Sequence, residues 1–110
     1  MEALIVQCTA SSIEEARTIA RALLEARLAA CVSLVGGVES HYWWRGALEQ
    51  ANEVLLLIKT TRERFEEVRR AILDHHSYEV PEIIAVDVVA GHGPYLEWLA
   101  ESVGGKEAGA

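Results

Sequence analysis

Hydrophobic and polar positions alternate along the chain in short blocks that predict four strands and three helices. Runs of apolar and β-branched residues are typical of buried strands, and they occur at residues 3–9, 30–44, 48–60 and 83–89. Apolar residues that recur every three or four positions predict helices at 13–28, from 62 to before Pro81, and at 95–102. A Ser-x-x-Glu capping box at Ser11–Glu15 and a Thr-x-x-Glu box at Thr60–Glu63 predict the first two helix starts.

The order of these elements, βαββαβ, indicates a ferredoxin-like α+β fold. In that fold an antiparallel sheet carries both main helices on one face, and here a short C-terminal helix follows. Gly36-Gly37 in the middle of the second strand region predicts a kink, and residues 45–47 predict a hairpin turn. We expect a single domain over residues 1–103 and a disordered tail at 104–110.

This topology places several chemically capable residues at one end of the sheet. The end of the first strand, the hairpin 41–44 and the end of the second helix meet there, which brings together Cys8, His75, His76 and Tyr78. Cys31 begins the second strand at the opposite end, about 20 Å away at ~3.3 Å per residue. We therefore expect two free thiols, because a disulfide needs Cα atoms within about 7 Å.

The composition indicates a globular protein and argues against nucleic-acid-binding and membrane-spanning classes. The 110 residues are 51% hydrophobic and 25% charged, which is ordinary globular usage. A net charge of −7 and a pI near 5.0 argue against a nucleic-acid partner. The longest apolar run, residues 54–58, is too short to cross a membrane, and the N-terminus has no basic signal region, so we expect a cytoplasmic protein. The sequence contains no catalytic signature, which predicts that the protein is not an enzyme.

Trp43 and Trp44 bear on assembly. Adjacent strand residues point to opposite faces, so one indole is expected to pack under the helices and the other to face away from them. An indole exposed beside Tyr42 predicts a subunit interface. The alternative is that the C-terminal helix covers it.

Five segments together resemble the CutA family of divalent-cation tolerance proteins. They span nearly the whole chain: LAAC at 28–31, GVES-x-YWW-x-G at 37–46, LLLIKT at 55–60, HH-x-YEVPEII at 75–84 and YLEWL at 95–99. The resemblance implies a tightly packed homotrimer, related in architecture to PII signalling proteins, that acts in tolerance of copper and other divalent cations. Some bacterial members are described as binding copper through a cysteine of the first strand and two adjacent histidines. Eukaryotic relatives are linked to acetylcholinesterase anchoring.

Carried to this sequence, that copper site corresponds to Cys8, His75 and His76. A thiolate and two imidazoles suit copper or zinc, and a thiol before a helix N-terminus favours the thiolate. Adjacent helical residues diverge by ~100°, however, so His75 and His76 can chelate one ion only if the helix has unwound there. The alternative is structural: His75 continues an apolar stripe as a core histidine, and Cys8 is a small hydrophobe.

Three functions follow from these residues. The first is a homotrimeric metal-binding or metal-tolerance protein. The second is a PII-like regulatory module that holds a small anion or metabolite between subunits, near Lys59 and the segment 78–82. The third, a hydrolase or transferase, would need Cys8 and His75 as nucleophile and base, and the sequence names no third group to orient them.

Overall fold

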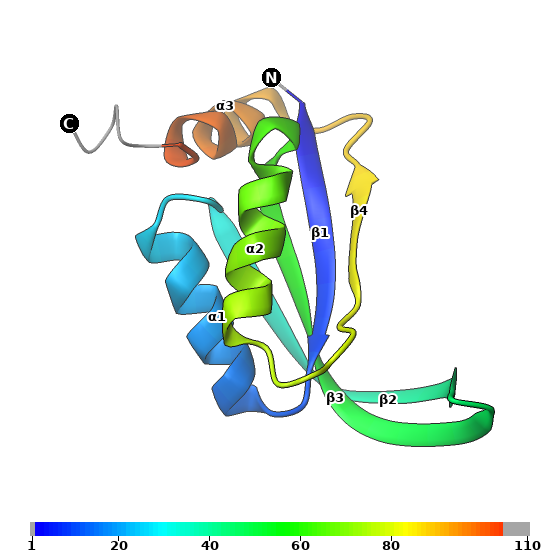
Figure 1. The fold of residues 1–110 in the computed structure, drawn as a ribbon. Coiled ribbons are helices and arrows are strands. Elements are labelled where there is room, and N and C mark those ends of the chain that lie inside the picture. Colours follow the sequence, from blue (N-terminus) through cyan, green and yellow to red (C-terminus); the bar gives the residue numbers. More distant parts are fainter. Residues whose placement is uncertain (1, 105–110) are drawn as a thin grey trace.

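The predicted order of elements is present in the computed structural model, which describes residues 2–104 (Figure 1). The elements are β1 (Ala3–Ala10), α1 (Ile13–Glu25), β2 (Cys31–Trp44), β3 (Ala47–Thr61), a 3-10 turn (Arg62–Arg64), α2 (Phe65–His75), β4 (Ile83–Asp87) and α3 (Gly93–Ser102). The first helix is shorter than predicted because the chain turns after Glu25, with Arg27 in the left-handed region at φ 58°.

One of the two predicted capping boxes forms. The Ser12 hydroxyl accepts a hydrogen bond from the Glu15 N–H at 3.1 Å, and Glu15 in return accepts from the Ser11 N–H at 3.0 Å. The box predicted at Thr60–Glu63 was wrong, since Thr61 makes no side-chain cap and the chain enters α2 through the 3-10 turn. The Thr60 hydroxyl instead donates to the Leu28 carbonyl at 2.6 Å and ties β3 to the loop after α1.

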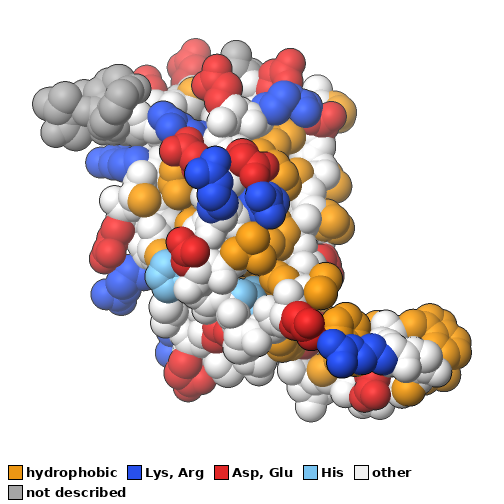
Figure 2. Space-filling model, viewed as in Figure 1, with side chains coloured by type: hydrophobic (Ala, Val, Ile, Leu, Met, Phe, Trp, Pro, Cys, Tyr) orange, Lys and Arg blue, Asp and Glu red, His pale blue; other side chains and the backbone are white. Residues whose placement is uncertain are grey.

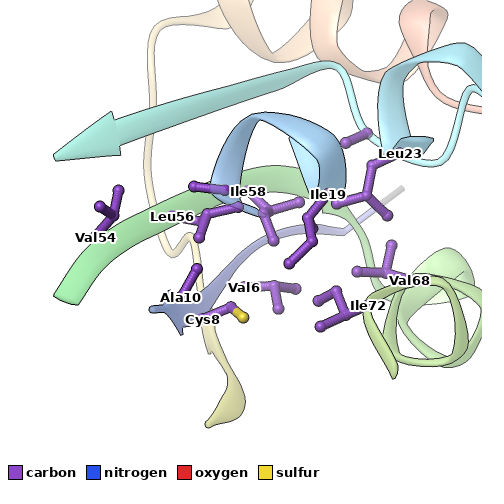
Figure 3. Packing of buried hydrophobic residues seen from close by; sticks show 12 residues of the cluster. Val6, Cys8, Ala10, Ile19, Leu23, Val54, Leu56, Ile58, Val68 and Ile72 are labelled. Atoms are coloured by element: carbon purple, nitrogen blue, oxygen red, sulfur yellow. The ribbon is translucent and has the colours of Figure 1, made fainter. Parts of the chain in front are cut away.

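The sheet has the strand order β2-β3-β1-β4, with every pair antiparallel, and α1 and α2 cover one face (Figure 1). Side chains alternate between the two faces as period two requires. The side chains facing the helices form the core, in which residues of β1 and β3 pack against α1 and α2 (Figure 3): Val6, Cys8, Ala10, Ile19, Leu23, Val54, Leu56, Ile58, Val68 and Ile72. This is the predicted α+β ferredoxin-like arrangement.

The predicted kink in β2 is a β-bulge. The register between β2 and β3 shifts between Val35 and Val38, and Gly37 adopts φ 79°, a left-handed value that glycine accommodates without strain. Beyond the bulge, the two strands extend past the ends of α1 and α2 as a two-stranded ribbon, residues 38–53, which we call the arm. The arm projects from one end of the sheet (Figure 1) and contributes to a molecule 47 Å long.

The sheet face opposite α1 and α2, here called the open face, is largely apolar. Cross-strand partners on it include Leu57, Gln7 and Ile84 in one row, and Lys59, Ile5 and Val86 in the next. Within the described chain, Ile84 remains 51% exposed and Val86 46% exposed. Because strand β4 is also a sheet edge, this region presents both apolar side chains and unpaired backbone groups.

Helix α3 crosses the end of the sheet far from the arm (Figure 1) and anchors itself through Leu99, which is buried. Gly104 belongs to this packed region, because its N–H donates to the Arg27 carbonyl at 2.7 Å. The remainder of the predicted tail, residues 105–110, lies outside the described residues. Across residues 2–104, every helix is too short or too polar to span a lipid bilayer.

Both cysteines are free thiols, as predicted. Cys31 pairs with Lys59, which pairs with Ile5, so Cys8 lies three residues along and two strands across from Cys31. That geometry separates them by roughly 14 Å, less than the distance expected from the sequence but twice what a disulfide allows. They also lie on opposite faces of the sheet, since Cys8 faces the helices and Cys31 the open face.

Candidate functional site

The end of the sheet next to the arm gathers the residues singled out by the sequence. Strand β1 ends there at Ala10, α1 begins at Ile13, and α2 ends at His75 (Figure 1). Cys8 pairs with Leu56 on one side and Ile83 on the other, two residues before the strand ends. His76 and Tyr78 follow α2 in the loop that leads to β4.

The Cys8 thiol points into the core. Its side chain is fully buried beside Val6 (Figure 3), and its sulfur lies 3.8 Å from the Thr9 carbonyl oxygen. Burial, followed by the negative charges of Glu82, Glu15 and Glu53, raises the pKa of the thiol to about 12. The expected thiolate at the helix N-terminus was therefore wrong, because desolvation in the core outweighs the helix dipole.

His76 is bound at both ring nitrogens. Its Nε2 lies 2.7 Å from the Thr9 carbonyl oxygen, and its Nδ1 accepts the Tyr78 N–H at 3.1 Å. These two partners require a neutral ring with the proton on Nε2. The ring thus ties the loop after α2 to the residue that follows Cys8.

His75 faces another direction. It is the last residue of α2, is exposed, and has its Nδ1 2.9 Å from the Ala71 carbonyl oxygen one turn earlier. A groove between α1 and α2 is lined by His75 together with Arg17 and Arg21. The alternative of a core histidine was wrong, because the stripe of Val68 and Ile72 reaches the surface at the last turn of the helix.

The three predicted ligands share one end of the sheet but not one point in space. The helix ends between the two histidines, since His76 has extended dihedrals, yet their rings still face different partners. In the part of the chain that the structure describes, no group of three or more His, Cys, Asp or Glu side chains is arranged to hold a metal ion. A metal site from these residues requires a rearrangement or a contribution from another subunit.

Glu15 fixes the loop against α1. Its second carboxylate oxygen accepts the Ser77 N–H at 2.6 Å, while the first caps the helix through Ser11. Burial acts to raise the pKa of Glu15, but the hydrogen bonds from Ser11 and Ser77 outweigh it and lower the pKa. The loop therefore has a negative charge at its base and a fixed position relative to β1.

A hollow of about 750 Å³ lies between this loop and the foot of the arm. Its lining combines aromatic rings with carboxylates: Tyr42, Trp43, Trp44, Tyr78, Glu53, Glu79 and Glu82. Lys59, which the sequence had placed with the segment 78–82, is not part of it. Lys59 lies on the open face, where its Nζ donates to the Ser33 hydroxyl at 2.6 Å.

Glu53 is the residue in this hollow that the sequence reading missed. Only 8% of it is exposed, and it accepts a hydrogen bond from the Tyr78 hydroxyl at 2.7 Å. Burial and then this bond to Glu53 raise the pKa of Tyr78. The signal that could have revealed it is the glycine pair, because the bulge shifts the register immediately beside the Val38–Glu53 pair.

The tryptophan pair lies on the arm. Trp43 is 71% exposed and Trp44 38% exposed, and the arm carries hydrophobic side chains out to its tip (Figure 2). The expectation that one ring packs under the helices was wrong, as was the alternative of cover by α3, which lies at the other end of the molecule. The Arg45 guanidinium lies 5.1 Å from the centre of the Trp44 ring and bonds Glu79 at 2.8 Å.

Together, the sheet order, the two helices on one face and the projecting arm define a ferredoxin-like α+β protein with an extended β-ribbon. The family model described as CutA1 divalent ion tolerance protein matches residues 4–102, and the chain belongs to this family.

Two bacterial and archaeal relatives match this chain in sequence over nearly its full length. The divalent-cation tolerance protein CutA of Thermus thermophilus is 46% identical over 100 residues, covering 91% of this chain and 97% of that protein. Its counterpart in Archaeoglobus fulgidus is 42% identical over 98 residues, covering 89% and 95%. The solved structure of the Thermus thermophilus protein superposes with a TM-score of 0.91 at 45% identity, covering 93% of this chain and 99% of that one.

Proposed function

We propose that this protein is a non-enzymatic homotrimer that binds a soft divalent metal ion, copper above all, with Cys8, His75 and His76 as candidate ligands. Assembly is supported by the apolar surface that one chain leaves uncovered, both on the open face and on the arm. A non-enzymatic role is supported by Cys8, whose pKa of about 12 keeps the thiol protonated and a poor nucleophile at neutral pH.

The observation that carries the metal proposal is the charge around Cys8. Glu82, Glu15 and Glu53 each contribute to the raised pKa of the thiol, so this end of the sheet has a negative potential. The same charges that oppose a thiolate attract a cation, and a bound cation in turn stabilises the thiolate. The names of the relatives, divalent-cation tolerance proteins, point to the same class of ligand.

Binding at these residues has two structural consequences. The His76 ring must exchange its hydrogen bond with Thr9 for the metal, whereas the Nε2 of His75 has no hydrogen-bond partner in residues 2–104. The Cys8 thiol must lose its proton, whose pKa is about 12. Because metal and proton compete for the sulfur, affinity should rise with pH by up to about tenfold per unit wherever the free thiol is protonated.

Titration of tag-free protein with copper tests the ligand set. We expect Cys8→Ser to weaken binding at pH 7.5 by at least about tenfold, because a hydroxyl cannot replace a thiolate as a soft ligand. The matched control is Cys31→Ser on the open face, which should bind as wild type does. Cys8→Ala and a circular dichroism spectrum exclude misfolding as the cause. Equal affinity in wild type and both Cys8 variants would remove Cys8 from the site.

The cellular compartment is also a proposal. We propose the cytoplasm, as the sequence analysis predicted, while the names of relatives point to other compartments. The rice relative is named "Protein CutA 1, chloroplastic", and the Archaeoglobus fulgidus structure is described as a periplasmic divalent cation tolerance protein.

A second candidate function is a PII-like module that binds a small molecule at the foot of the arm. The hollow of about 750 Å³ favours it, since small-molecule sites are concave, of a few hundred to about 1,000 Å³, and lined by aromatic and a few polar groups. The arm that forms one wall is also the predicted subunit contact, so assembly and ligand binding share a surface. Equal copper affinity in wild type and in a variant lacking Cys8, His75 and His76 would favour this function over the first.

A further inference from the structure

The hollow at the foot of the arm holds a buried negative charge without a positive partner. Glu53 is more than nine-tenths buried and lines the hollow. Its recorded partner is the neutral Tyr78 hydroxyl, and among residues 2–104 no Lys, Arg or His nitrogen lies within ion-pair distance of its carboxylate. Burying a carboxylate without a counter-charge is costly, so this position is suited to a cation from outside the chain.

The remaining lining favours the same charge. Glu82 adds a second carboxylate, and Glu79 adds a third that pairs with Arg45 from outside the lining, which itself contains no lysine or arginine. His41, at the rim, already pairs with Glu39 at 2.7 Å. The lining of this hollow therefore repels an anion. The cleft near Lys59 is a separate place, and the small anion or metabolite expected there stays a prediction.

The aromatic side chains that line the hollow favour an organic cation over a metal ion as its ligand. Tyr42, Trp43, Trp44 and Tyr78 all line the hollow. Aromatic faces attract alkylated ammonium groups, whereas a divalent metal needs several oxygen, nitrogen or sulfur ligands converging on one point. As described above, residues 2–104 offer no such convergent group.

Arg45 already makes a contact of this kind, in which a cationic group lies against an aromatic ring and a carboxylate. The Arg45 guanidinium lies against the Trp44 ring and pairs with Glu79 of the opposite wall, so an organic cation is held between an indole and a carboxylate. Arg45 and Glu79 are both mostly exposed, so this contact can open at little cost.

Tyr78, which lines the hollow beside Glu53, is held in place before any ligand binds. The Tyr78 hydroxyl donates to Glu53, and the Tyr78 N–H donates to His76. The centres of the Tyr78 and His76 rings lie 4.7 Å apart. His76 is in turn held by the Thr9 carbonyl. A ligand therefore meets a carboxylate and a ring whose positions need not be ordered on binding.

We propose that the hollow binds a small organic cation, an alkylammonium whose charged nitrogen lies against Glu53 and whose alkyl groups contact Tyr78 and the aromatic residues of the arm. This inference rests on the second candidate function, because it names the ligand class of that same hollow. It does not require metal binding at Cys8, although the two proposals share the charge of Glu53 and the position of His76.

Titration of the full tag-free chain tests it, with tryptophan fluorescence and calorimetry as readouts and ionic strength held constant. The probes are tetramethylammonium, spermidine, sodium and ADP. We expect the two organic cations to bind, and Glu53→Gln to weaken them by at least about tenfold, because the amide keeps the Tyr78 bond but loses the charge. The matched control, Glu97→Gln on α3, should bind as wild type does.

The other outcomes overturn the inference in distinguishable ways. Binding of ADP but not of the organic cations would leave the second candidate function in place and reject the ligand class. Binding of no probe would reject both. Unchanged affinity in Glu53→Gln would place the ligand elsewhere. Dissociation of the assembly in Glu53→Gln would show that a cationic side chain of another subunit fills the hollow.

Discussion

Replacement of Ile58 by alanine is expected to reduce the free energy of unfolding by about 2–5 kcal/mol, because the cavity it leaves cannot collapse. Ile58 is fully buried on β3, with Val32 of β2 and Val6 of β1 as its cross-strand partners. Ile19 of α1 lies next to it in the core (Figure 3), and α1 and α2 cover this face of the sheet. Its neighbours lie on strands and helices that are packed against one another, so the space can refill only in part.

The control for this substitution is Leu73→Ala on α2. Leu73 is half-exposed on the outer side of the helix, and alanine is a better helix former, so the change should stay within about 1 kcal/mol. Guanidinium unfolding at one fixed chain concentration measures both variants, since the stability of an oligomer depends on concentration. Equal losses in the two variants would contradict the assigned core.

Replacement of Trp43 by alanine is expected to weaken subunit association by about 3–5 kcal/mol, the cost of removing a fully buried indole. The ring is 71% exposed in the single chain, so in the proposed homotrimer another subunit would have to bury it. The loss should therefore appear in the association constant and leave the secondary structure of each chain intact.

Trp98→Ala is the matched control for the arm. Trp98 is a partly exposed tryptophan on α3, where it contacts Tyr95 at the end of the molecule opposite the arm (Figure 1). Sedimentation over a range of concentrations should show dissociation in Trp43→Ala and none in Trp98→Ala. A Trp43→Ala protein that sediments as wild type does at all concentrations would exclude that ring from the interface.

The projection of the arm has a simple origin that the sequence already contains. Strands β2 and β3 have 14 and 15 residues, whereas α1 and α2 have 13 and 11. A strand rises ~3.3 Å per residue and a helix 1.5 Å, so strands of about 46 Å extend well beyond helices of about 20 Å. Helical cover therefore ends near the bulge, and neither Trp43 nor Trp44 can pack under a helix.

Periodicity predicted the elements well because burial imposes it along every strand and helix. The order of the elements then placed Cys8, His75 and His76 at one end of the sheet, because the topology decides which strand and helix ends meet. It could not predict the direction of each ring, because His75 and His76 take their hydrogen-bond partners from α2 and β1 respectively. The buried charge of Glu53 also escaped prediction, since it depends on tertiary contact with Tyr78 rather than on local pattern.

Native mass spectrometry of the tag-free protein with added copper tests whether it is a homotrimer that binds copper through Cys8, His75 and His76. Wild type is compared with the triple variant Cys8→Ser/His75→Ala/His76→Ala. We expect three chains with bound copper in wild type and three chains without copper in the variant. A single chain, or the same copper content in both proteins, would contradict it.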